Sequence, residues 1–285
     1  MSFGENIKDI YMSEEQFDLI SEFIKERFGL VFKKDKRLTL HARLAHRLSI
    51  LGINSYTEYY NLLLNNPEEG FNLVSHIANN ETYFFREKSQ LTAFSELLVE
   101  IKRNKQKTNS NKLTILSAGC SSGEEPFTLN ILLIESGLFA WGWQTEIIGI
   151  DISKTALKKA QKAQYTQNSF RMMNGDDGFI KKYFEFLDGK YILKRPYRHN
   201  INFKHGNILE PSCFEGLSNI DVIFSRNVLI YMSDEALEAI IRNYYNSLSD
   251  DGYLVLGSSE SLLGRTDLFV PEQKNGVIFY RKNRA

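Results

Sequence analysis

The sequence predicts a small all-helical N-terminal domain followed by an α/β domain with a doubly wound, Rossmann-like sheet. Residues 1 to about 100 carry apolar residues at helical spacing and no convincing strand. Beyond about residue 112, short apolar runs alternate with helical segments, and this alternation implies parallel strands with helices on both faces of a sheet. A chain of 285 residues is long enough for two such unequal domains.

Four helices are predicted in the N-terminal part. A capping-box pattern at Ser13–Gln16 opens the first helix, and Gly29 ends it. Leucines spaced by four and three residues from Leu40 to Leu51 predict the second helix. Another capping-box pattern, Ser55–Glu58, opens the third helix, and Phe71–Ile77 forms the fourth. Together these segments predict a small helical bundle.

The strands of the α/β domain are predicted from short apolar runs. They cover residues 113–117, 146–151, 201–205, 220–225 and 253–256. Helices are expected at 126–137 and from Ser153 and Ser233 onward. A last apolar run, Val277–Tyr280, has no helix after it, so we expect an antiparallel strand at the edge of the sheet.

Two segments do not follow this alternation. The polar stretch Lys102–Lys112 is expected to be a loop. Residues 176–202 contain Asp188-Gly189 between two aromatic, β-prone runs, and this dipeptide is typical of a tight hairpin turn. We therefore place the N-terminal domain at residues 1–85, a linker and helix at 86–112, and the α/β domain at 113–285, with a small β-rich insertion at about 176–202.

The composition excludes several classes of protein. Basic and acidic side chains balance at 35 each, which excludes a generally basic protein that coats nucleic acid. With only 2 cysteines and no metal-ligand spacing among the 5 histidines, we expect neither a disulfide scaffold nor a bound metal. The N-terminus lacks a signal-peptide pattern, and no apolar stretch reaches the length of a membrane span. We expect a cytoplasmic monomer that is not inserted in a membrane.

A glycine-containing loop follows the first predicted strand and opens the next helix. Its sequence, from Ala118 to Pro126, is AGCSSGEEP. It lacks the middle glycine of the dinucleotide fingerprint, and Glu124 and Glu125 at the helix start would repel a pyrophosphate. A cationic or zwitterionic ligand would instead be attracted. Taken alone, the loop is explained equally well as a plain turn between a strand and a helix.

Asp151, at the end of the second predicted strand, favours a ligand. An acid at this place accepts hydrogen bonds from ribose hydroxyls, although an Asx turn is the alternative explanation. Together, the loop and Asp151 predict S-adenosylmethionine, whose sulfonium and ammonium groups are both positive. Asn207 and Ile208 follow the third strand and could hold adenine, and Arg226 and Asn227 follow the fourth. Taken singly, each of these four is better explained as a turn or surface residue.

Four motifs together resemble the chemotaxis receptor methyltransferase family, usually called CheR. They are Asn80–Glu87 (NETYFFRE), Ser117–Pro126 (SAGCSSGEEP), Phe224–Tyr231 (FSRNVLIY) and Gly257–Ser261 (GSSES). Their order and spacing match the family across nearly the whole chain. The resemblance implies a methyltransferase domain with an inserted β-subdomain behind a helical domain. The implied activity is methyl transfer from S-adenosylmethionine to glutamates on the cytoplasmic helices of methyl-accepting chemoreceptors, leaving S-adenosylhomocysteine.

The resemblance also implies roles for individual residues. The cofactor contacts would be Asn80, Thr82, Arg86, Gly119, Glu124, Asp151, Asn207, Ile208, Arg226 and Asn227. Arg86 is a sensible partner for the methionine carboxylate. Independently of the resemblance, the hydroxyl of Tyr231 could orient the substrate carboxylate by a hydrogen bond, although core packing explains this tyrosine equally well. The receptor would be recognised by Lys36, Arg43, His46 and Arg47 of the N-terminal domain.

The basic residues of the N-terminal domain form a stripe. Arg43 and Arg47 are four residues apart and share a helix face, which Lys36 continues. A solvated basic face is the simpler explanation of such a stripe. The chain also departs from the family in two ways: His46 stands where an arginine is usual, and the hairpin Phe186–Lys190 is short. A longer loop there goes with binding a pentapeptide tether, so we expect a tether-independent member.

The implied chemistry needs no general base. A glutamate side chain has a pKa near 4.3, so the acceptor is already ionised at neutral pH. Cys120 has no recognisable base partner in the sequence and is interpreted as a small polar filler. Three alternatives stay open: a methyltransferase of another carboxylate, a non-catalytic S-adenosylmethionine-binding regulatory module, and an NAD oxidoreductase, which the missing glycine disfavours.

Overall fold

The computed structural model describes residues 11–78, 80–173 and 177–284, which form two compact units. One unit comprises Met1–Asn79 together with Tyr231–Leu237. The other comprises Asn80–Ile230 and Glu238–Ala285. The N-terminal unit therefore includes a short segment that comes from a distant part of the sequence.

The N-terminal unit is a helical bundle, as predicted. Its helices are α1 (Glu14–Phe28), α2 (Arg37–Leu51), α3 (Tyr56–Asn65) and α4 (Pro67–Ile77), with a short 3₁₀ turn, η1 (Lys34–Lys36), before α2. Both hydrogen bonds of the Ser13 capping box form, and Gly29 ends α1 with φ 73°. The core contains the apolar stripes that predicted these helices, among them Ile20, Ile24, Leu40, Leu44, Leu48 and Leu73.

The distant segment pairs with the chain just after α1. Val31 N donates to Tyr231 O at 2.9 Å, and Ser233 N donates to Gly29 O at 2.8 Å. Leu30 and Met232 form an antiparallel bridge between these two bonds. The backbone hydrogen-bonding groups at this point of the bundle are thus satisfied by residues that follow the α/β domain's strand β7 in the chain.

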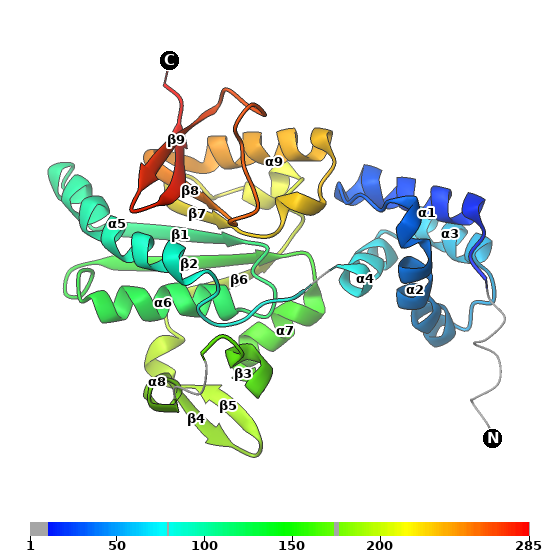
Figure 1. Cartoon of the computed structure of the whole chain (residues 1–285), viewed down its shortest axis with the longest axis horizontal. Helices are drawn as coiled ribbons and strands as arrows, with labels where there is room; N and C mark the ends of the chain where they lie inside the picture. The colour runs from blue at the N-terminus through cyan, green and yellow to red at the C-terminus, as the bar shows by residue number, and fades with distance from the viewer. Residues whose placement is uncertain (1–10, 79, 174–176, 285) are drawn as a thin grey trace. The chain divides into compact units, whose positions relative to one another are not determined.

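The second unit is built on a 7-stranded sheet with the order β6-β2-β1-β7-β8-β10-β9 (Figure 1). The strands are β1 (Lys112–Ala118), β2 (Gln144–Asp151), β6 (Ile201–His205), β7 (Ile220–Ser225), β8 (Leu248–Leu256), β9 (Phe269–Lys274) and β10 (Val277–Lys282). The pairs from β6 to β8 are parallel, and only β10 is antiparallel to its neighbours β8 and β9. The predicted Rossmann-like sheet is therefore confirmed.

The helices α5 (Lys88–Lys107) and α6 (Glu124–Ser136) bury their apolar side chains with one face of this sheet. The helices α7 (Lys154–Lys162) and α9 (Asp234–Ser247) complete the alternation of strands and helices (Figure 1). The sequence pattern explains this layering, because β1 and β7 are buried almost throughout and are mostly apolar. Crossover helices then place the carboxyl ends of β1, β2, β6 and β7 at a common edge.

Two expectations about secondary structure were wrong. The segment Lys102–Lys107 is not a loop but the last part of α5, whose last buried residue is Ile101. The strand at Val277 is antiparallel, as expected, but it is not at the edge, because β9 pairs with its outer side. Although α5 is 20 residues long, no helix in the described ranges has both the length and the apolar character to cross a membrane.

The β-rich insertion forms a 3-stranded sheet of β3 (Gln164–Tyr165), β5 (Lys190–Leu193) and β4 (Phe184–Leu187). Asp188 and Gly189 have φ 51° and 74° and join the paired residues Leu187 and Lys190, which is the geometry of a two-residue hairpin turn. The sheet begins well before the expected boundary at residue 176, which itself lies outside the described residues.

Candidate functional site

The loop between β1 and α6 needs backbone conformations that favour glycine. Gly119 and Gly123 have φ 82° and 91°, and Gly119 N donates to Ile150 O of β2 at 2.8 Å. A Cβ on Gly119 would lie 2.4 Å from Cγ2 of Val228, and one on Gly123 would lie 2.8 Å from Cβ of Ala160. The glycines therefore let this loop pack closely against its neighbours at the carboxyl end of the sheet.

Three acidic side chains gather around this loop. Glu124 and Glu125 lie in the first turn of α6, and Asp151 ends β2. Glu124 accepts hydrogen bonds from the hydroxyls of Ser122 at 2.7 Å and Ser169 at 3.0 Å. Burial raises the pKa of all three carboxyl groups. A cationic ligand would offset the cost of burying these charges, whereas an anion would add to it.

Asp151 forms the Asx turn that the sequence left open, and its carboxylate can still accept further hydrogen bonds. Its Oδ1 accepts from Ser153 N at 2.8 Å, as in an Asx turn, and its Oδ2 accepts from Ser121 N at 2.7 Å. A carboxylate has about four lone-pair sites, so two remain for other donors. The hydrogen bonds within the chain fix the orientation of this carboxylate without exhausting its capacity to hold ribose hydroxyls.

Arg226 is buried beneath the loop. Its Nη1 lies 3.2 Å from Oε2 of Glu125, its Nη2 lies 3.4 Å from Oε2 of Glu87, and its side chain is 2% exposed. Its Nη2 also donates to Arg86 O at 2.5 Å. Sequence reasoning did not single out Glu87 as a site residue. Its partner lies far away in the chain, so the only available signal was its place at the end of the NETYFFRE motif.

Two buried polar atoms at this edge have no hydrogen-bond partner among the described residues. They are Nε of Arg226 and Oδ1 of Asn227. Asn227 itself has φ 59°, an uncommon conformation that asparagine tolerates better than most residues. An unpaired donor and an unpaired acceptor next to a glycine loop are what a site for a polar cofactor requires. The residues present therefore fit a nucleoside cofactor that carries positive charge.

The other predicted cofactor residues take up different positions. Asn207 is buried and accepts from Leu209 N at 3.1 Å, and Ile208 beside it is buried too. Asn80 presents its main-chain carbonyl, which accepts from the Ser121 hydroxyl at 3.1 Å. Arg86 donates to Glu81 O at 3.0 Å, and its guanidinium lies over the Tyr83 ring. Thr82 is half-buried.

Phe84 anchors the segment that carries Asn80 and Arg86. Its ring is fully buried against Tyr165, Phe170 and Phe184, with ring centroids 4.8 to 5.2 Å apart. Its backbone N donates to Ser169 O at 2.9 Å. Phe84 therefore packs into the core, and this packing holds the neighbouring polar residues of the motif in place within this unit.

Cys120 has no environment for nucleophilic catalysis. It is buried, and burial, together with the nearby charge of Asp151, raises the pKa of its thiol well above the ordinary value. A reactive cysteine needs the opposite shift. The filler interpretation of this residue agrees with its surroundings.

The predicted receptor-binding residues lie in the N-terminal unit. Lys36, Arg43 and His46 are exposed, although Arg43 Nη1 also donates to Ile77 O. Arg47 differs, because its guanidinium is paired with the buried Glu69, to which Nε donates at 2.8 Å. Tyr231 also belongs to this unit, where its carbonyl accepts from Val31 N. The structure thus gives Arg47 an internal partner that helical spacing could not reveal.

Glu69 is the centre of this internal network. Besides Arg47, it accepts hydrogen bonds from Tyr59 Oη at 2.9 Å and Asn72 Nδ2 at 3.3 Å. Burial raises the pKa of Glu69, but the hydrogen bonds from Arg47, Tyr59 and Asn72 outweigh burial and leave its pKa below the ordinary value.

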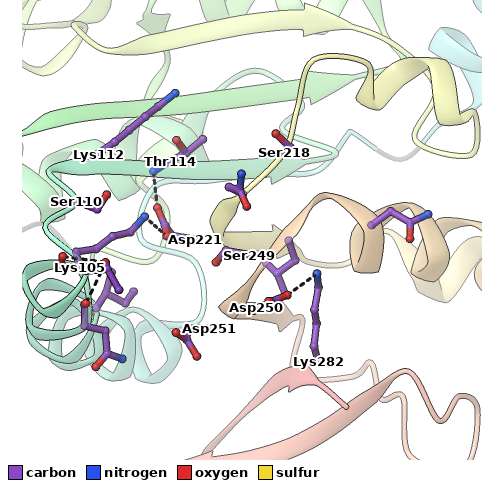
Figure 2. A pocket seen from close by; sticks show the side chains of 16 residues that line it. Lys105, Ser110, Lys112, Thr114, Ser218, Asp221, Ser249, Asp250, Asp251 and Lys282 are labelled. Atoms are coloured by element: carbon purple, nitrogen blue, oxygen red, sulfur yellow. Dashed lines mark hydrogen bonds and ion pairs between the residues drawn. The ribbon is translucent and has the colours of Figure 1, made fainter. Parts of the chain in front are cut away.

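A polar pocket of about 660 Å³ lies at the opposite end of the same sheet (Figure 2). Some of its residues lie at the amino ends of strands, including Lys112 of β1 and Asp221 of β7, and others come from α5 and from the end of β10. Lys105 Nζ lies 2.6 Å from Oδ1 of Asp221, and Lys282 Nζ lies 3.5 Å from Oδ1 of Asp250. In these pairs the charges of Asp221 and Asp250 are offset by lysines. The pocket therefore suits a cationic cofactor less well than the acids around the glycine loop do.

The Rossmann-like sheet and the acid-lined glycine loop at its carboxyl edge define an S-adenosylmethionine-dependent methyltransferase. Comparison with known families agrees. Residues 80–277 match the domain described as "CheR methyltransferase, SAM binding domain", and residues 15–77 match "CheR methyltransferase, all-alpha domain". The chain therefore belongs to the CheR methyltransferase family.

Relatives with curated names match over most of the chain. "Chemotaxis protein methyltransferase 2" of Vibrio cholerae is 30% identical over 98% of this chain and 97% of its own length. "Chemotaxis protein methyltransferase" of Borreliella burgdorferi is 28% identical over 91% and 93%. "Probable biofilm formation methyltransferase WspC" of Pseudomonas aeruginosa is 29% identical over 86% of this chain but only 57% of its own length.

Proposed function

We propose that this protein is a protein-glutamate O-methyltransferase that methylates the cytoplasmic helical domain of chemoreceptors. The observation that carries the proposal is the set of acids around a glycine loop at the carboxyl edge of the sheet, namely the buried Glu124 and Asp151 and the partly buried Glu125. This set suits a cofactor with positive charge. The names of the relatives that match nearly the full length support the choice of substrate.

The chain's residues have a limited task in this reaction. When bound, S-adenosylmethionine supplies an electrophilic methyl group. Asp151 orients the ribose, and the other acids favour the positive charges of the cofactor. The acceptor glutamate is ionised at neutral pH because its ordinary pKa is near 4.3, so no residue needs to remove a proton. Catalysis then depends on alignment and on exclusion of water.

The finer assignments belong to the same proposal. Arg86 would hold the methionine carboxylate, Asn207 and Ile208 the adenine, and Tyr231 the acceptor carboxylate. Lys36, Arg43 and His46 would contact the acidic receptor helix, and their exposure in the N-terminal unit supports this. We propose that the protein acts in the cytoplasm as a monomer and that its short hairpin at Asp188-Gly189 needs no receptor tether.

The decisive experiment is methyl transfer from radiolabelled S-adenosylmethionine to membranes that contain chemoreceptors. We expect label in the receptor and its release as methanol on alkaline treatment, because a glutamyl methyl ester is base-labile. Receptors whose methylated glutamates are changed to alanine are the control. Label in a small carboxylic acid instead, or binding of the cofactor without turnover, would favour one of the alternative functions.

A further inference from the structure

The carboxylate of Glu260 is bound by five backbone N–H groups of the described residues. Its Oε2 accepts from Asn227 N and Gly257 N, both at 2.7 Å. Its Oε1 accepts from Val228 N at 2.9 Å, Leu229 N at 2.8 Å and Ile230 N at 3.2 Å. Four of these donors are consecutive residues that follow β7. We call this arrangement the Glu260 clamp.

The Glu260 clamp holds the stretch of chain that follows β7. The left-handed conformation of Asn227 turns successive N–H groups to one side, which creates a small nest for an anion. Here the anion is a side chain of the protein itself. Gly257 makes room for it, because a Cβ at this position would lie 2.7 Å from Oε2 of Glu260 and 2.9 Å from Asn227 N.

The clamped residues reach the cofactor loop on their other side. The Val228 side chain occupies the space that a Cβ on Gly119 would need, so Val228 packs directly against the turn of the glycine loop. The neighbouring Asn227 carries the buried Oδ1 that has no hydrogen-bond partner, and Arg226, one residue earlier, carries the equally unpaired Nε. The position of these groups therefore depends on where Glu260 holds their backbone.

We propose that Glu260 is a positioning residue of the cofactor site. Its carboxylate is occupied by backbone donors, so it acts through Asn227 and Val228 rather than by touching the cofactor. It sets the distance between the loop after β7 and the glycine loop after β1, and thereby the shape of the space that receives S-adenosylmethionine. The kinetic part of the test below rests on the proposed methyl transfer, whereas the binding part does not.

The substitution Glu260→Gln tests this in the full-length protein. It keeps the size of the side chain but replaces one acceptor oxygen with an NH₂ group that faces backbone donors. We expect the Kd for S-adenosylhomocysteine, measured by calorimetry, to rise about tenfold, the equivalent of about 1.4 kcal/mol. The KM for S-adenosylmethionine should rise with it, while the KM for the receptor stays unchanged.

Asp221→Asn is the matched control. Asp221 is a buried carboxylate that also accepts from a backbone N–H, that of Thr114 at 2.9 Å, but at the opposite end of the same sheet. This variant should lower the thermal stability and leave the Kd for S-adenosylhomocysteine as in the wild type. If both variants weaken binding equally, Glu260 has only a general structural role, and the proposal is overturned.

A double-mutant cycle with Asn227→Ala adds a readout that stability alone would not change. If Glu260 acts through Asn227, the two substitutions will be non-additive in the Kd. Should Glu260→Gln fail to fold, Gly257→Ala displaces the carboxylate without removing it and must weaken binding. An unchanged Kd in a folded variant overturns the proposal. Failure of the wild-type protein to bind S-adenosylhomocysteine would instead overturn the cofactor site itself.

Discussion

The buried Arg226 forms an ion pair with the partly buried Glu125 in the first turn of α6, with 3.2 Å between Nη1 and Oε2. Glu125 has a second polar contact, because Oε1 accepts from the Ser117 hydroxyl at 2.7 Å. The pair joins the end of β7 to the start of α6, two elements that are far apart in the sequence. A role for Arg226 in holding the acids of the site in place follows from this geometry.

Replacing Arg226 with alanine should strongly destabilise the protein. The change leaves Glu125 and Glu87 without their cation, and breaking a buried pair in this way costs about 3–5 kcal/mol. Urea unfolding of the full-length protein measures the loss. The control is Arg242→Ala, which removes an exposed pair with Glu238 on α9 and should cost less than about 1 kcal/mol. Equal losses in the two variants would contradict the prediction.

The buried acids predict opposite pH dependences for stability and for cofactor binding. Burial raises the folded-state pKa of Glu124, Glu125 and Asp151, so the folded protein without cofactor binds more protons than the unfolded chain. The stability that these groups contribute is therefore present at low pH and is lost as the pH rises through their folded-state pKa values. Binding of a cation requires the charged forms and should improve over the same range.

Comparing S-adenosylmethionine with S-adenosylhomocysteine isolates the contribution of the sulfonium charge to the pH dependence of binding. As the pH falls through the raised folded-state pKa values of these acids, the affinity for S-adenosylmethionine should fall more than that for S-adenosylhomocysteine, which lacks the sulfonium charge. Calorimetric titrations at several pH values give the ratio of the two Kd values. In Glu124→Gln this ratio should depend less on pH. A ratio that stays constant in the wild type would show that the acids do not respond to the sulfonium.

Asp151→Ala should weaken the binding of S-adenosylhomocysteine. Each hydrogen bond from a ribose hydroxyl to the carboxylate contributes about 1.5–3 kcal/mol. Because Asp151 also accepts from Ser121 N and Ser153 N, the variant should unfold at lower temperature as well. Asp250→Ala removes a mostly exposed carboxylate and serves as the control. If the folded Asp151→Ala variant keeps the wild-type Kd, the carboxylate does not hold the ribose.

The basic stripe is best tested at Lys36 and Arg43, which are exposed. Replacing both with alanine should leave the Kd for S-adenosylhomocysteine unchanged, slow receptor methylation, and weaken its dependence on salt. The reason is that these charges would guide the protein to an acidic receptor helix without reaching the cofactor. Methylation at the wild-type rate in low salt would identify the stripe as ordinary surface.

Arg47 is expected to behave differently from Arg43. Its removal leaves Glu69 buried without a cation, so Arg47→Ala should reduce the free energy of unfolding by about 3–5 kcal/mol. Lys36→Ala, whose pair with Asp35 is exposed, is the matched control. A loss of receptor methylation in Arg47→Ala at unchanged stability would show that this arginine contacts the receptor after all.

Local patterns predicted the elements of the fold better than their ends or their partners. The apolar spacing of α1 and α2 and the buried runs of β1 and β7 depend on neighbouring residues, so they were visible in the sequence. The end of α5 was not visible, because Lys102–Lys107 continue the helix beyond its last buried residue. The edge position of β9 was hidden because its residues are largely exposed.

The candidate site, too, could be predicted only where its residues lie close together in the sequence. The glycine loop and Asp151 could be predicted because a strand, a turn and a helix lie next to each other in the chain. The roles of Glu87 and Glu260 could not, since Glu87 pairs with Arg226 and four of the five donors to Glu260 lie at least 30 residues away. Helical spacing likewise placed Arg47 on the basic stripe, but only the structure shows Glu69 of α4 against it.

The pairing of Tyr231–Ser233 with the residues after α1 limits how this protein can be divided. A truncated protein that begins at Asn80 would keep this segment but lose its partner, leaving Ser233 N and Tyr231 O without their hydrogen bonds. The helical bundle alone would lose the same contact from the other side. A cut at Asn80 therefore separates Tyr231–Leu237 from the helical unit to which it belongs.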